Sequence, residues 1–183
     1  MTTGFFRGAA GTLGAATFAA VLVGGAGPAA AQEASTNRVG ANTDWSLFVE
    51  GSPQECWAVS APKEMVATRD GNPVSVRRDD PLMFVTWRPA QNVASEVSYT
   101  GGYPFAPDST VSLDIGGTRF DLYVDGTWAY AAPEQDAAIV AAMKAGASAV
   151  LVARSARGNT TTDTFSLLGF TATVDEAARR CAG

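Results

Sequence analysis

Hydrophobic and polar residues alternate most regularly in the middle of the chain, between positions 110 and 131. Two dipeptides interrupt the alternation, Gly116-Gly117 and Asp125-Gly126, and both suit two-residue hairpin turns that need positive φ. The pattern therefore predicts a meander of three antiparallel strands over residues 110–115, 118–124 and 127–131.

Pairing these strands about their turns separates the side chains into two faces. Around the second turn, the expected register places Trp128 opposite Tyr123 and Tyr130 opposite Asp121. The face expected to be buried consists of Val111, Leu113, Ile115, Phe120, Leu122, Val124, Ala129 and Ala131. The other face is polar but rich in aromatic residues, and consists of Ser112, Asp114, Arg119, Asp121, Tyr123, Trp128 and Tyr130.

Shorter patterns on both sides of the meander predict further strands and two helices. The strands are expected at 45–50, 55–61, 74–78, 82–87, 95–100, 149–154 and 162–168. One helix should begin at Pro133 and end at Lys144, and a capping box from Thr173 to Glu176 should open a second that ends near Cys181. These elements predict a mainly β fold, an antiparallel β-sandwich with two short helices, one after the central meander and one at the C-terminus.

The N-terminal segment has the pattern of a secretory signal peptide. Arg7 precedes an apolar run over 9–23, and the small residues Ala29, Ala30 and Ala31 precede Gln32. A transmembrane anchor is the alternative, but the run is shorter than the roughly 20 residues that a spanning helix needs. We therefore expect a signal peptide over 1–31 with cleavage after Ala31, a flexible lead-in over 32–43 and a single domain over 44–183. The mature chain should then be periplasmic, secreted or associated with the outer envelope, with no integral membrane span.

Composition excludes several functions. The chain has no histidine, which removes Ser-His-Asp and Cys-His catalysis and histidine-based zinc sites. Its 13 basic and 18 acidic side chains give a net charge of -5, which argues against nucleic-acid binding. No phosphate-binding glycine motif and no calcium-loop spacing occurs, so we expect no cofactor and no metal.

The two cysteines, Cys56 and Cys181, most simply form a disulfide if the chain is exported. Such a bond would close a loop of almost the whole domain and contribute roughly 4 to 5 kcal/mol in the chain-entropy model. Two separate buried thiols are the alternative.

Two patterns are similar to catalytic motifs but have simpler explanations. Ser60-Ala61-Pro62-Lys63 matches the S-x-x-K motif of penicillin-recognising enzymes, yet the companion motifs are absent and Ser60 ends a strand instead of opening a helix. The acid pairs that a glycosidase would need are Asp79 with Asp80, Asp121 with Asp125, and Glu134 with Asp136. Loop, turn and helix-start positions account for all of them.

The aromatic face of the meander is the strongest candidate for a binding site. Tyr123, Trp128 and Tyr130, beside Asp121, can stack on a sugar or anchor a protein partner if they are exposed together. The alternative is that a helix covers them or that they lie inside the sandwich.

Several motifs resemble the invasion associated locus B family of exported alphaproteobacterial envelope proteins. They are DWSLFVE at 44–50, ECW at 55–57, SAPKE at 60–64, GGYPF at 101–105, ARSARG at 153–158 and DTFSLLGF at 163–170, with the terminal Cys181. The resemblance implies a small exported β-rich protein of a family named after a member linked to bacterial entry into red blood cells, and it implies no catalytic residues.

The sequence as a whole predicts an exported, non-enzymatic envelope protein that binds an envelope or host-cell component, either a protein or a glycan. The alternative function is a hydrolase of cell-wall or polysaccharide material that uses two carboxylates.

Overall fold

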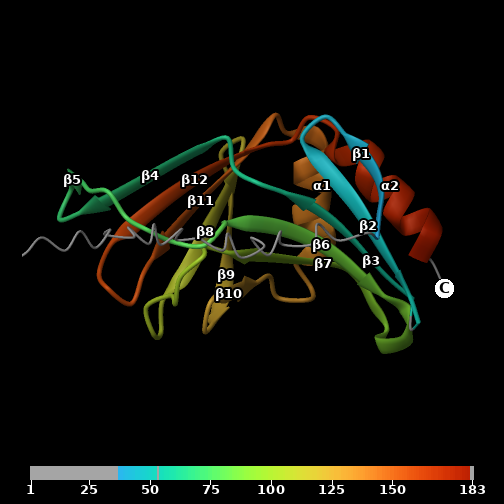
Figure 1. Ribbon diagram of the computed structural model, residues 1–183, viewed down its shortest axis with the longest axis horizontal. Helices are drawn as coiled ribbons and strands as arrows, with labels where there is room; N and C mark the ends of the chain where they lie inside the picture. The colour runs from blue at the N-terminus through green and yellow to red at the C-terminus, as the bar shows by residue number, and fades with distance from the viewer. Residues whose placement is uncertain (1–36, 53, 182–183) are drawn as a thin grey trace, which may run out of the picture. The chain divides into compact units, whose positions relative to one another are not determined.

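The computed structural model describes residues 37–52 and 54–181 (Figure 1). The expected signal peptide, its cleavage site and the first part of the lead-in lie outside these residues. The elements in chain order are β1 Arg38–Asn42, β2 Trp45–Gly51, β3 Gln54–Ser60, β4 Glu64–Arg69, β5 Asn72–Pro73, β6 Leu82–Arg88, the 3-10 turn Pro89–Gln91, β7 Val93–Thr100, β8 Thr110–Ile115, β9 Thr118–Asp125, β10 Trp128–Tyr130, α1 Asp136–Ala145, β11 Ser148–Arg154, β12 Thr160–Ser166 and α2 Phe170–Cys181.

All the strands belong to one antiparallel sheet, in the order β1-β2-β3-β6-β7-β10-β9-β8-β11-β12-β4-β5. The sheet does not close. Instead it curls, so that its inner face packs against itself as the two layers of a sandwich do: the ring centroids of Tyr99 in β7 and Phe165 in β12 are 6.1 Å apart. The predicted mainly antiparallel β fold is confirmed, with one helix after the meander and one at the C-terminus.

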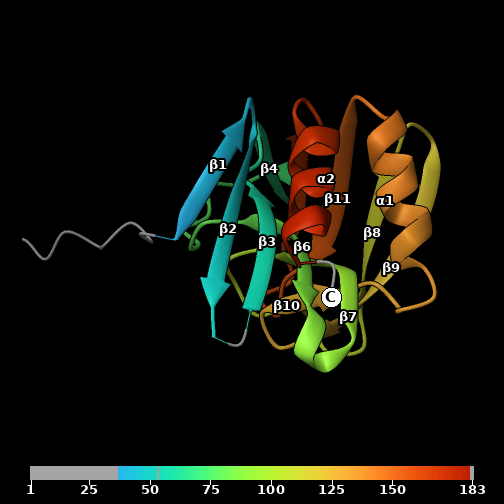
Figure 2. The same cartoon turned by 90° about the vertical axis from the view of Figure 1, so that its right-hand side faces the viewer.

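Both helices pack on the inner face of the sheet, where Figure 2 shows them side by side. Ile139 and Met143 of α1 and Phe170 and Val174 of α2 are buried in the same core as the inner residues of the strands. Trp45 of β2 meets Phe170 edge to face at 4.8 Å. The outer face of the central strands therefore has neither of these helices over it. Neither helix has the length and apolar run needed to cross a bilayer.

The meander forms as predicted, apart from the register of its second hairpin. Gly116 and Gly117 both have positive φ, and the pairing around them matches the prediction. In the second hairpin the turn is formed by Gly126 and Thr127, so that Asp125 pairs with Trp128. The predicted register was wrong by two positions because Gly126, with φ +61°, occupies the first place of the turn, as a type II′ turn requires. A shift of two leaves every side chain on its predicted face.

Replacing Gly126 with valine should destabilise this hairpin by about 1 to 2 kcal/mol, because a β-branched residue resists positive φ. No atom lies within 4 Å of an added Cβ at Gly126, so the cost comes from the backbone alone. Gly51 is a matched control, since its Cβ position is equally open and its φ is not in the positive range. Urea denaturation should show Gly126→Val well below the wild type and Gly51→Val close to it; equal midpoints for the two variants would contradict the turn assignment.

Three segments differ from the sequence prediction. β1 occupies residues 38–42, so the expectation of a flexible lead-in does not hold there. β4 was not predicted because it lies near the edge of the sheet, with most of its side chains exposed on both faces and therefore no alternating pattern. The predicted strand over 74–78 is irregular instead, and its conformation is set by long-range contacts of Arg78 and Asp79.

Candidate functional site

Four aromatic side chains form a continuous row on the outer face of the sheet. We call the row the aromatic surface and define it as Phe84, Trp128, Tyr130 and Tyr123. Neighbouring ring centroids are 5.4 Å apart for Phe84 and Trp128, 6.3 Å for Trp128 and Tyr130, and 5.7 Å for Tyr130 and Tyr123. The sequence prediction that Tyr123, Trp128 and Tyr130 share one face is confirmed.

The strand order explains how rings from separate strands meet. β7 lies between β6 and β10, and its residue Ser98 is paired with Phe84 on one side and with Tyr130 on the other. Because Ser98 is small, rings from both neighbouring strands can approach above it, and Ser98 is only 4% exposed. The row is therefore a continuous surface rather than a set of isolated rings.

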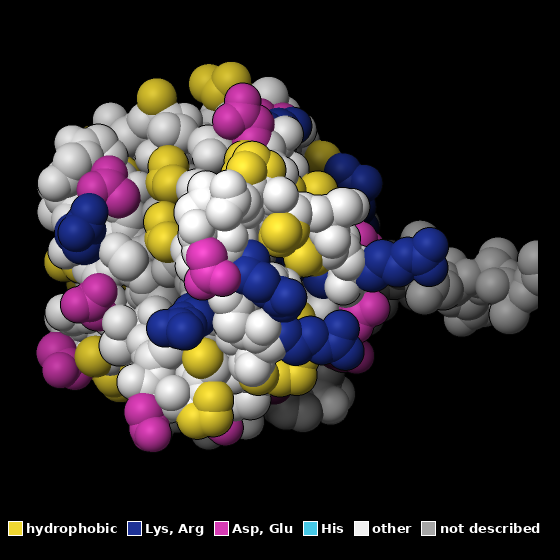
Figure 3. All heavy atoms as spheres, turned by 90° about the vertical axis from the view of Figure 1, so that its left-hand side faces the viewer, with side chains coloured by type: hydrophobic (Ala, Val, Ile, Leu, Met, Phe, Trp, Pro, Cys, Tyr) yellow, Lys and Arg dark blue, Asp and Glu magenta, His cyan; other side chains and the backbone are white. Residues whose placement is uncertain are grey.

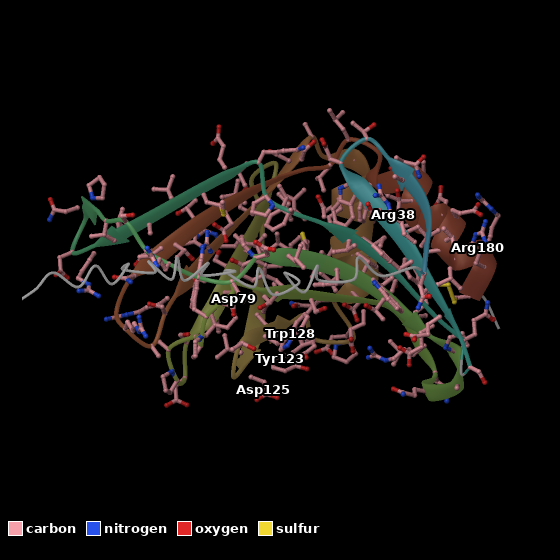
Figure 4. The ribbon with its side chains drawn as sticks, in the orientation of Figure 1. Arg38, Asp79, Tyr123, Asp125, Trp128 and Arg180 are labelled. Atoms are coloured by element: carbon pink, nitrogen blue, oxygen red, sulfur yellow. A yellow bond between two sulfur atoms is a disulfide. The ribbon has the colours of Figure 1, made fainter. Side chains whose placement is uncertain are left out.

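The aromatic surface is partly open to solvent. Tyr123 is 53% exposed, and Phe84, Trp128 and Tyr130 are half-buried. Figure 4 shows Trp128 and Tyr123, with Asp125, on the side of the sheet away from the helices. Neighbouring aromatic rings that are partly exposed on one face of a sheet can contact a ligand together.

Acidic side chains surround this surface. Asp121 is exposed on the same face of β9, two positions before Tyr123, whereas Asp125 is directly opposite Trp128. Burial raises the pKa of Tyr130, and the carboxylates of Glu96 and Asp125 raise it further. Arg88, which pairs with Glu96 at 2.8 Å, offsets part of this negative potential.

Three of these neighbours, Phe84, Asp125 and Glu96, are not among the site residues that the sequence predicts. The sequence pattern places Asp125 in the turn, and the predicted register pairs Asp121 with Tyr130. Phe84 and Glu96 lie on β6 and β7, and no local pattern indicates that β10 is inserted next to β7.

The family model of the invasion associated locus B (IalB) protein matches residues 106–178. This segment runs from just before β8 into α2, and it includes Tyr123, Trp128 and Tyr130. Over these residues the chain is similar to the invasion associated locus B family. Neither the comparison with curated proteins nor that with solved structures gives a match.

The chain has a disulfide between Cys56 in β3 and Cys181 at the end of α2, with the Cα atoms 6.1 Å apart. The predicted pairing is confirmed in the structure. Both cysteines are buried, and nearby the side-chain amide of Gln54 donates a hydrogen bond to the carbonyl of Arg180 at 2.8 Å. The disulfide therefore connects α2, which begins within the segment matched by the family model, to β3, which lies outside that segment.

The residues of the S-x-x-K pattern have structural contacts. The Ser60 hydroxyl donates to the carbonyl of Asp44 at 2.7 Å, and Lys63 Nζ lies 2.5 Å from the Asp44 carboxylate. The hydrogen bond from Lys63 holds the pKa of Asp44 below its ordinary value. Ser60 and Lys63 both bind Asp44 and so help to hold the start of β2.

Of the three predicted acid pairs, Asp121 and Asp125 lie in β9 beside the aromatic surface, and the other two lie on other segments. Asp136 is buried at the start of α1 and accepts a hydrogen bond from the Val97 amide at 2.8 Å, and burial raises its pKa to about 6. Glu134 is exposed, and so are Asp79 and Asp80, which lie in the irregular segment before β6. Within residues 37–52 and 54–181, no three acidic or cysteine side chains gather as a metal site would require.

Proposed function

We propose that this protein is an exported member of the IalB family that acts by binding, without catalysing a reaction, and that its aromatic surface binds an uncharged glycan of a cell envelope. The observation that carries the proposal is the row of four neighbouring rings on an outer sheet face. Export is supported by the family and by the Cys56–Cys181 disulfide, because such bonds persist in oxidising compartments.

The orientation of the rings suits a sugar chain. The planes of Trp128 and Tyr130 are inclined by 24° and those of Tyr130 and Tyr123 by 30°, so the three neighbouring rings are close to parallel. The C–H faces of sugar rings pack on aromatic rings, and consecutive sugars can occupy consecutive rings. Tyrosine and tryptophan also lose little conformational entropy on binding, because each has only two side-chain torsions.

The charges at the edge favour a neutral ligand over an anionic one. Asp121, Asp125 and Glu96 surround the rings, and carboxylates accept hydrogen bonds from sugar hydroxyls. The same carboxylates repel polyanions such as uronic-acid polymers. A protein partner would be expected to bring a basic patch, and it remains an outcome of the test below.

Replacing Trp128 with alanine should weaken glycan binding at least tenfold, because a central aromatic contact contributes roughly 2 kcal/mol or more. Affinity electrophoresis in gels that contain glycol chitin, dextran or alginate measures the retardation. The wild type should be retarded by at least one of the two neutral polymers and not by alginate, and Trp128→Ala should migrate as it does in an empty gel.

Trp57→Ala is the matched control, since Trp57 is also half-buried on the outer face and stacks on Phe48 at 5.9 Å, outside the row. It should be retarded as the wild type is. Equal loss in both variants, or no retardation of the wild type by either neutral polymer, would contradict the glycan proposal. Capture of a protein from envelope extracts that depends on Trp128 would then assign the surface to a protein partner, and clearing of glycol chitin would favour the carboxylate hydrolase.

A further inference from the structure

A second surface of the molecule has the opposite charge. A cleft of about 610 Å³ lies where the irregular segment 74–81 passes the loop between β11 and β12. Four arginines line it, Arg69, Arg77, Arg78 and Arg157, against the single carboxylate of Asp79. The chain as a whole carries a net charge of -5, so the charge of this cleft has the opposite sign. Figure 3 shows Lys and Arg side chains gathered on this end of the described domain.

One wall of the cleft is fixed by a buried ion pair. Both terminal nitrogens of Arg78 contact the Asp163 carboxylate, at 2.8 and 2.5 Å, and Arg78 also donates to the carbonyl of Gly101 at 3.2 Å. The Asp79 amide donates to the carbonyl of Gly102 at 3.0 Å. Gly102 has φ +74°, and a Cβ there would lie 2.0 Å from the backbone carbonyl oxygen of Asp79. Only glycine therefore permits the two backbones to approach this closely. The segment that carries Arg77 is therefore held in place although it is not a strand.

The other wall is fixed by side-chain contacts to the loop between β11 and β12. Arg69 Nε donates to the Asn159 side-chain oxygen at 2.9 Å, and its terminal nitrogen donates to the carbonyl of Arg157 at 3.1 Å. The backbone N–H of Asn159 in turn donates to the Ser155 hydroxyl at 3.1 Å. These contacts order the backbone around Arg157 and orient Arg69 before any ligand arrives.

Of the four arginines at this cleft, only Arg78 has an acidic partner in the part of the chain that the structure describes, and Arg69 donates its hydrogen bonds to Asn159 and to the carbonyl of Arg157. Among the described residues, Arg77 and Arg157 form no ion pair, and both are exposed. Other arginines do have acidic partners, since Arg88 pairs with Glu96 and Arg180 with Glu176. Guanidinium groups bind phosphate and carboxylate through two parallel hydrogen bonds, and arginines on two walls suit an anion with more than one charge.

We infer that this cleft binds a multiply charged oxyanion, with phosphate or carboxylate groups held between Arg77 and Arg157. The site shares no residue with the aromatic surface and does not depend on the proposed glycan binding. The ligand proposed for the cleft is anionic, whereas the glycan proposed for the aromatic surface is uncharged. The whole protein would thus offer two separate sites for two kinds of group.

Isothermal titration calorimetry with pyrophosphate and with citrate tests the inference on the disulfide-bonded protein at low ionic strength. The double variant Arg77→Gln, Arg157→Gln should bind at least about tenfold more weakly than the wild type, because each charged hydrogen bond lost is worth a factor of this order. The control is Arg179→Gln, Arg180→Gln, which changes the net charge equally on α2, where both arginines contact Glu176. It should bind as the wild type does.

Tighter binding of pyrophosphate would assign phosphate as the preferred group, and tighter binding of citrate would assign carboxylate. Binding in the wild type should weaken as salt is added, because the guanidinium groups are exposed. Equally weakened anion binding in both double variants would mean that only the net charge of the protein matters and would contradict the proposed site. Absence of heat with both anions in the wild type would overturn it as well. A thermal melt of each variant checks that the fold is intact.

Discussion

Replacing Asp163 with asparagine should lower the free energy of unfolding by about 3 to 5 kcal/mol, because it leaves a buried arginine without its counter-charge. The Asp163 side chain is 0% exposed and that of Arg78 is 8% exposed. Asp163 also accepts a hydrogen bond from the Tyr99 hydroxyl at 2.5 Å, and burial, reinforced by the charge of Asp163, raises the pKa of Tyr99 so that it stays protonated. One carboxylate therefore connects β12 to β7 and to the segment before β6.

Asp175→Asn is the matched control for this change. It removes the carboxylate that pairs with Lys144 at 2.6 Å, but these side chains are 45% and 39% exposed. Exposed pairs contribute about 0 to 1 kcal/mol, so the control should unfold close to the wild type in urea. Similar small losses in both variants would show that the Asp163 pair does not hold the curled sheet together.

The second large effect is expected for Cys181→Ser. The disulfide closes a loop with a sequence separation of 125 residues. Its removal should cost about 4 to 5 kcal/mol in the chain-entropy model and lower the melting temperature by about 10 to 15 °C. Differential scanning calorimetry under oxidising conditions measures the shift.

Reduction provides the control for this prediction. Wild-type protein in dithiothreitol should melt near the Cys181→Ser variant, and the reductant should leave the melting temperature of the variant unchanged. A variant that melts with the oxidised wild type would show that the Cys56–Cys181 bond does not stabilise the domain in solution.

The parts of the fold that the sequence predicted are those with one buried and one solvated face. In the meander, Leu113, Leu122 and Ala129 alternate with polar residues, and glycine in the turns fixes where the chain reverses. β4 was not predicted because both its faces are largely exposed, so its sequence does not alternate between hydrophobic and polar residues.

The candidate site was predictable only in part, for a related reason. Tyr123, Trp128 and Tyr130 lie on neighbouring strands of one hairpin, where local register determines which face they share. Phe84 and Glu96 join them through the pairing of β10 with β7, which brings together residues distant in sequence. The arginine-lined cleft depends still more on tertiary contacts, since its walls are positioned by Asp163 and Asn159.

The most direct test of the central claim uses the four tryptophans as reporters. Protein labelled with 5-fluorotryptophan should give one ¹⁹F NMR resonance for each, and Trp128→Phe identifies that of Trp128. Trp45 and Trp87 are buried, and Trp57 lies outside the aromatic surface. Titration with the neutral polymer that retards the wild type should shift the Trp128 resonance and leave the other three in place. An unchanged Trp128 resonance at saturating polymer, or a shift confined to Trp57, would contradict the account.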